Sequence, residues 1–175
     1  MIMDALLLFD GSVNAQGALS GTSVNSGTTF TTGSATDSQN IIDVSQVASS
    51  PSGRGRDVGI GDGPDLQIAI EVMSAFAGTG ASMQIALQTA PDNGAGAPGA
   101  WNVINMTPVI PVANLVAGQI TYLDIVPGVQ KFLKLTYTVT GANMTAGSIV
   151  STIVLDRELL GPNLGYPSGY STQYV

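Results

Sequence analysis

The sequence contains neither histidine nor cysteine, and few of its side chains are charged. Without cysteine there is no disulfide framework and no zinc–thiolate site. Without histidine, the commonest general base and transition-metal ligand is missing. Asp, Glu, Lys and Arg make up 10% of the chain, against about 25% in an average domain. We therefore expect a largely neutral surface, which suits permanent contact with other subunits. A neutral, Ser/Thr-rich monomer is the alternative.

Positive charge is scarcest, because 5 basic residues stand against 12 acidic ones and give a net charge of -7. So few cations cannot neutralise an extended phosphate backbone, and we expect no direct nucleic-acid partner. Long apolar runs are also missing. The longest, Ala5–Phe9, is far shorter than the roughly 20 residues that span a bilayer, and no basic segment precedes it. The sequence predicts no signal peptide, no transmembrane helix and no membrane partner.

What the chain does contain is the period-two alternation of half-buried strands. It recurs over residues 65–72, 83–88, 101–106 and 132–139. Further strands are predicted over 120–126 and 148–155, and a short apolar stretch covers 41–44. Helical signals are limited to single turns at 1–9 and 112–117. We predict one all-β domain over residues 1–175: a jelly roll or β-sandwich of about eight short antiparallel strands.

Two segments fit this core less well. Residues 11–38 are rich in Gly, Ser and Thr, and we interpret them as an arm or loop that stays mobile or becomes ordered against a neighbouring subunit. Within this segment Phe30, flanked by threonines, is a candidate anchor for a short strand. Residues 159–175 read as an irregular tail, and tyrosines recur at every fourth position at Tyr166, Tyr170 and Tyr174.

The densest acidic cluster, Asp57, Asp62 and Asp65, lies among glycines. Calcium binds carboxylates on such turns, but the EF-hand spacing and its closing glutamate are absent, so a tight turn before a strand is the favoured interpretation. Just before it, Arg54 and Arg56 flank Gly55 and precede Asp57. An Arg–Asp pair, within the loop or between subunits, is the expected role, because guanidinium groups match carboxylates.

Catalytic patterns are weak. A glycosidase needs two carboxylates at one cleft, whereas Asp65 and Glu71 would lie about 20 Å apart on one strand. Serine has neither a nucleophile-elbow motif nor a Ser-x-x-Lys pair here. We expect no enzyme, no cofactor and no metal site.

Aromatic side chains on the predicted strands give the rival hypothesis. Trp101, Tyr122, Phe132 and Tyr137 could line a sugar-binding face, which would make the protein a virion-surface carbohydrate-binding jelly roll. That hypothesis requires a solvent-exposed aromatic row. Core packing is the commoner use of aromatics on alternating strands.

Several short motifs occur together in a fixed order. They are Met3–Phe9, Asn40–Asp43, Gly53–Gly61, Leu133–Tyr137 and Thr145–Gly147. By their order and spacing, the chain from Met1 to about Glu158 resembles the Bbp16 family of tailed-phage capsid cement proteins. None of these motifs is catalytic, and the tail after Arg157 lies beyond the resemblance.

The resemblance implies a structural virion protein on the outside of an expanded HK97-type capsid, made in the host cytoplasm. Its implied partners are the major capsid protein, which it would bridge, and its own copies, as a homodimer or alternatively a homotrimer. Residues 11–38 and 162–175 would then become ordered on the shell or on a sister subunit. The candidate inter-subunit or loop-fixing contacts are Phe30, Arg54, Arg56, Asp57, Tyr166, Tyr170 and Tyr174.

Overall fold

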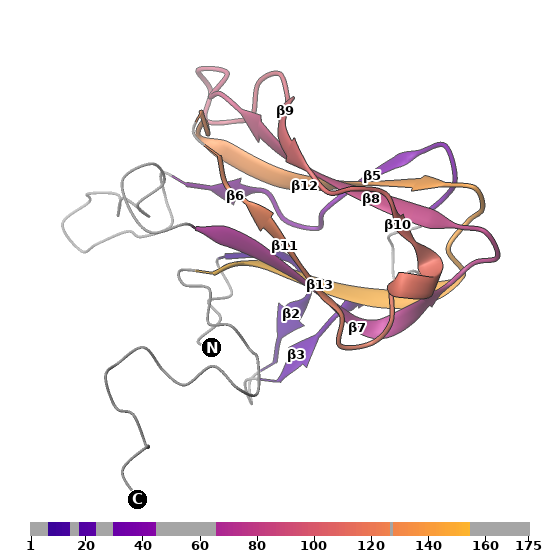
Figure 1. Ribbon diagram of the computed structural model, residues 1–175. Coiled ribbons are helices and arrows are strands. Elements are labelled where there is room, and N and C mark those ends of the chain that lie inside the picture. The colour runs from indigo at the N-terminus through magenta and orange to yellow at the C-terminus, as the bar shows by residue number, and fades with distance from the viewer. Residues whose placement is uncertain (1–6, 15–17, 24–29, 45–65, 127, 155–175) are drawn as a thin grey trace, which may run out of the picture.

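The computed structural model describes residues 7–14, 18–23, 30–44, 66–126 and 128–154. Over these residues two antiparallel sheets lie face to face as a β-sandwich (Figure 1). The predicted all-β class is therefore confirmed. A small separate ribbon, β2 (Ser12–Val13) with β3 (Leu19–Ser20), lies beside the sandwich.

Each layer is built around one pair of long strands. In the first sheet β13 pairs with β7, β1 and β4, and β11 pairs with the other side of β7. In the second sheet β8 and β12 form the central pair, flanked by β9 and β10 on one side and by β5 and β6 on the other. The first sheet comprises β1 (Leu8–Asp10), β4 (Thr22–Ser23), β7 (Gln67–Ala77), β11 (Ile120–Asp124) and β13 (Ala146–Val154). The second comprises β5 (Ala35–Asp37), β6 (Ile42–Asp43), β8 (Ser82–Ala90), β9 (Asn102–Met106), β10 (Ile110–Pro111) and β12 (Phe132–Thr140).

The hydrophobic core lies between the layers and follows the alternation of the sequence. The apolar positions predicted for one face of each long strand are buried together, because successive side chains of a strand point to opposite faces. They include Ile68, Ile70 and Val72 of β7, Met83, Ile85 and Leu87 of β8, Leu133, Leu135, Tyr137 and Val139 of β12, and Ile149 and Ile153 of β13.

Most connections after β7 pass from one layer to the other. The Gly78–Gly80 turn, expected between two strands, joins β7 of the first sheet to β8 of the second. The corner from β12 back to β13 packs directly on it: a Cβ added to Gly141, whose φ is +87°, would lie 2.1 Å from the Gly80 carbonyl oxygen. Only glycine fits this contact between two backbones.

Described parts of the 11–38 segment belong to the sandwich of their own chain. β4 pairs with β13 and β5 pairs with β12, which the Gly/Ser/Thr composition did not suggest. Phe30 lies outside any strand, unlike the expectation that it anchors one, and Thr32 forms an isolated bridge to Val139.

The two predicted helical turns have different outcomes. In 112–117 a 3-10 turn, η2 (Val112–Asn114), is present. In 1–9 only the last three residues are described: Leu7 has 3-10 geometry, and Leu8 and Phe9 are extended, because Leu8–Asp10 pair with Ser151 and Thr152 of β13. Residues 1–6 of the predicted turn lie outside the described residues.

Candidate functional site

The strands β9, β10 and β11 and the turn η2 lie along one side of the sandwich (Figure 1). Among the described residues six large hydrophobics are exposed, and four belong to this side: Val103, Met106, Val109 and Val116, at 48–55%. Residues 93–123, which build it, contain no Asp, Glu, Lys or Arg. We call it the uncharged side. Its absence of charge and its exposed apolar groups are properties of protein-binding surfaces.

Side-chain amides hold the uncharged side together. Asn105 of β9 donates from Nδ2 to the Asp124 carbonyl of β11 at 2.8 Å, which ties the two sheets across their edges. Gln84 of β8 donates to the Thr107 carbonyl at 3.0 Å. The Thr107 hydroxyl in turn accepts from the Ile85 N–H at 3.1 Å. These bonds fix β9 and the following loop to the scaffold, so the apolar groups are presented on a defined surface.

A groove on the uncharged side lies between β10 with the loop before it, η2 and the beginning of β11. It has a volume of about 410 Å³ and is lined by Thr107, Pro108, Ile110, Ala113, Asn114, Val116, Gln119 and Thr121. None of these residues carries a charge, and amide or hydroxyl groups stand among the apolar ones. Such a lining is typical of pockets that take apolar or aromatic groups and orient them with a few hydrogen bonds.

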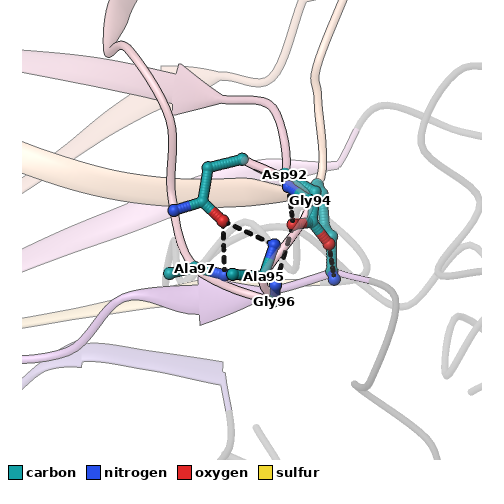
Figure 2. Close-up of polar contacts among 7 residues, drawn as sticks. Asp92, Gly94, Ala95, Gly96 and Ala97 are labelled. Carbon is teal, nitrogen blue, oxygen red and sulfur yellow. Dashed lines mark hydrogen bonds and ion pairs between the residues drawn. The ribbon is translucent and has the colours of Figure 1, made fainter.

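The loop after β8 is fixed by two side-chain acceptors (Figure 2). Asp92 Oδ1 accepts from the N–H groups of Gly94 and Gly96 at 2.8 and 3.0 Å. Asn93 Oδ1 accepts from the Ala95 N–H at 2.8 Å. Asp92 Oδ2 also pairs with Lys131 Nζ at 2.5 Å. The hydrogen bond from Lys131, followed by those from the two glycines, lowers the pKa of Asp92. The loop at the edge of the uncharged side is thus rigid rather than adaptable.

Lys134 connects the outer face of β12 to the start of β9. Its Nζ lies 2.7 Å from Asp37 Oδ2 and 4.6 Å from the centre of the Trp101 ring. Asp37 also accepts from the Thr136 hydroxyl at 2.9 Å. The ammonium therefore occupies one face of Trp101. Phe132 and Tyr137 are both buried. Trp101 and Tyr122 are half-buried. None of the four aromatics is fully exposed, so they do not form the exposed row that the carbohydrate-binding hypothesis requires.

A buried carboxylate lies between the two layers. Asp10 of β1 is 1% exposed, and its Oδ2 accepts from the Tyr137 hydroxyl at 2.5 Å and from Ser151 Oγ at 2.8 Å. Its Oδ1 accepts from the Gln39 N–H at 3.0 Å. Burial raises the pKa of Asp10, and the three hydrogen bonds oppose that rise. Burial and the neighbouring Asp10 charge raise the pKa of Tyr137. This network joins β1, β12 and β13 and serves the core.

Of the predicted contact residues, Phe30 lies within the described part of the chain. Its ring is 1% exposed and meets the rings of Phe76 and Tyr137 edge-on, at 5.8 and 5.4 Å. It therefore fixes its own loop to its own core. Arg54, Arg56, Asp57, Tyr166, Tyr170 and Tyr174 lie outside the described residues, as do Asp62 and Asp65.

Sequence reasoning missed the uncharged side and the Asp10 network. The signal for the first was available, because 93–123 is the longest stretch of the chain without a charged side chain. The described residues contain no group of three or more His, Cys, Asp or Glu side chains placed to hold a metal ion. Within the same residues, no helix has the length and apolar character to cross a membrane.

The fold and these surfaces define a β-sandwich protein with an uncharged, partly apolar side. A family model named Bbp16 matches residues 24–153, which include every strand from β5 to β12 and most of β13. The chain therefore belongs to the Bbp16 family and is a phage structural protein. Four of the five motifs that carried the resemblance lie inside the match, and Met3–Phe9 precedes it. No curated protein matches the chain.

Proposed function

We propose that this protein decorates the outside of an expanded phage capsid and bridges neighbouring major capsid proteins. The observation that carries the proposal is the concentration of exposed apolar side chains on the uncharged side of a Bbp16-family protein. A protein with a net charge of -7 meets a large partner most favourably where it carries no charge to desolvate. Val103 and Met106 are the proposed anchors on the shell.

The proposed role needs no chemical step. If the protein binds the expanded shell and not its precursor, its binding free energy adds to the stability of the expanded state. Contacts repeated over many copies make a modest affinity per copy sufficient. The rigid loop at Asp92 and the amide ties of Asn105 and Gln84 support this role, because a preformed surface loses little entropy on docking.

Co-sedimentation with expanded shells that lack the protein tests the proposal. Wild-type protein is expected to bind saturably and to raise the temperature at which the shells break. Light scattering on the free protein gives the mass of the unit that binds, for which a homodimer is the prediction. Absence of sedimentation at micromolar concentrations would refute the decoration role.

A matched pair of variants locates the contact. Val103→Asp combined with Met106→Asp places charge on the proposed anchors and should weaken binding by at least about tenfold. Ile41→Asp is the control, because Ile41 is exposed to the same degree, 50% against 48% for Val103, but lies outside the uncharged side. Equal binding by both variants would place the contact elsewhere.

A further inference from the structure

The groove between Thr107 and Thr121 has no occupant among the described residues, and the chain itself offers one. We propose that the C-terminal segment 159–175 of the same chain docks in this groove through its tyrosine side chains. The inference does not rest on the capsid role: Val103 and Met106, the proposed anchors on the shell, are not part of the groove lining, although Val116 belongs to the same side.

Chemical complementarity is the first argument. The groove is lined by uncharged residues, with Val116 49% exposed at its rim. Residues 159–175 likewise contain no Asp, Glu, Lys or Arg and carry Tyr166, Tyr170 and Tyr174 among leucine, proline and glycine. Tyrosine suits such a site because its ring fills an apolar cleft while its hydroxyl bonds to a polar group at the rim. Asn114 and Gln119 supply such groups.

The groove volume limits how much of the segment it can hold. At about 410 Å³, it is near the lower end of the range of roughly 300–1,000 Å³ found for ligand pockets. It accommodates one or two aromatic side chains, not the whole segment. Docking by individual tyrosines is therefore the arrangement that the size supports.

Reach is the second argument. Val154 ends β13 and stands in register with Gln67 of β7, which is in register with Asp124 of β11. Thr121 and Gln119 lie three and five positions before Asp124 along the chain. Together with the two strand spacings from β13 to β11, this places them about 15–20 Å from Val154. An extended chain covers this distance in about five or six residues. The chain from Leu159 or Leu160 onward is therefore long enough to reach the groove, and the three tyrosines come after this point.

Disulfide trapping in the full chain tests the proposal, because the natural sequence has no cysteine to interfere. The test pair is Val116→Cys in the groove with Ser168→Cys between two tyrosines. The control pair is Met73→Cys with Ser168→Cys. Met73 is 37% exposed on β7, six positions from Gln67 and hence about 20 Å from Val154, so the tail reaches it as easily.

Under mild oxidation the groove pair should close at least about tenfold faster than the control pair, because docking raises the effective concentration of the two thiols. The product should run as a monomer on a non-reducing gel. Replacing Tyr166, Tyr170 and Tyr174 by serine in the groove pair should lower its rate to that of the control. Equal rates for the two pairs would overturn the proposal, and so would an unchanged rate without the tyrosines. Predominant disulfide-linked dimers would show that the tail binds a second copy, and would overturn it too.

Discussion

The buried Asp10 carboxylate makes the stability of the protein depend on pH in a predictable direction. Because burial raises the pKa of Asp10, folding favours its protonated form. Its contribution to the free energy of unfolding is therefore complete below the unfolded pKa of about 4 and is lost as the pH rises through the folded value. Asp10→Asn keeps the shape of the side chain and removes this titration.

The hydrogen bond from the Tyr137 hydroxyl to Asp10 determines how much of this unfolding free energy is lost as the pH rises. Tyr137→Phe removes a donor from the buried Asp10 carboxyl and leaves no cavity, so it should cost about 1–3 kcal/mol near pH 7. The bond that it removes lowers the pKa of Asp10. Its loss raises that pKa further, so the decline in stability extends to higher pH. Ser151→Ala should act in the same direction. The double variant should cost less than the sum, because both changes raise the pKa of the same Asp10 carboxyl, and its protonated form, which keeps the Gln39 N–H, loses less when the two hydroxyls are removed.

Urea unfolding between about pH 4 and about pH 8 measures these effects. The quantity to plot is the difference in unfolding free energy between wild type and Asp10→Asn, because other carboxylates contribute equally to both and cancel. This difference should fall as the pH rises, and it should fall over a wider range in the Tyr137→Phe background. A difference that stays flat across the range would refute the assignment of a raised pKa to Asp10.

Three further changes test other parts of the structure. Gly147→Ala places a Cβ 2.4 Å from the Phe76 ring at a φ of +127°, and it should lower the free energy of unfolding in urea by about 2–5 kcal/mol. The control, Gly118→Ala, has a φ of +82° and open space around it, so it should cost only about 1–2 kcal/mol. Equal costs for the two variants would contradict the clash with Phe76. Lys134→Met removes the ammonium from the chain's single tryptophan, so the fluorescence emission should shift and about 1 kcal/mol should be lost; unchanged emission would count against the contact. Asp92→Ala should speed amide exchange at Gly94 and Gly96 but not at Ala95, whose acceptor is Asn93; uniform exchange would show that the loop is held otherwise.

The long strands were predictable because apolar and polar residues alternate within each segment, and this alternation determines which side chains are buried. Residues 66–72, 83–88 and 132–139 alternate, and the structure buries the apolar face of each. The short strands were not predictable in the same way. β4 and β5 consist of residues such as Thr22 and Thr36 in a Gly/Ser/Thr-rich stretch, and they are extended because β13 and β12 offer them backbone partners. Whether such a segment forms a strand depends largely on the strand that pairs with it, and the local sequence does not show which strand that is.

The candidate sites differ in the same way: some depend on partners that are distant in the sequence, and others are visible in the local sequence. Asp10 gains its donors from Tyr137 and Ser151, which are 127 and 141 positions away, so no local pattern marks it as buried. Phe30 was expected to anchor a short strand because its neighbours are threonines, yet it lies outside any strand and packs against Phe76 and Tyr137. The uncharged side is the opposite case. Its lack of charge is visible in the sequence, while its exposure depends on β9 and β11 meeting at one edge.

The position of β13 bears on how the protein is made. β13 lies between β1 and β7 and also pairs with β4, so the first sheet has a gap until residues 146–154 have been synthesised. At about 5–20 residues per second, the ribosome needs roughly 8–30 s to reach that point. Until then β1 has no strand to join, and one edge of β7 is unpaired. The first sheet can therefore close only when its last strand is made, and a substitution in β13 should reduce the yield of folded protein more than an equally buried one in β8.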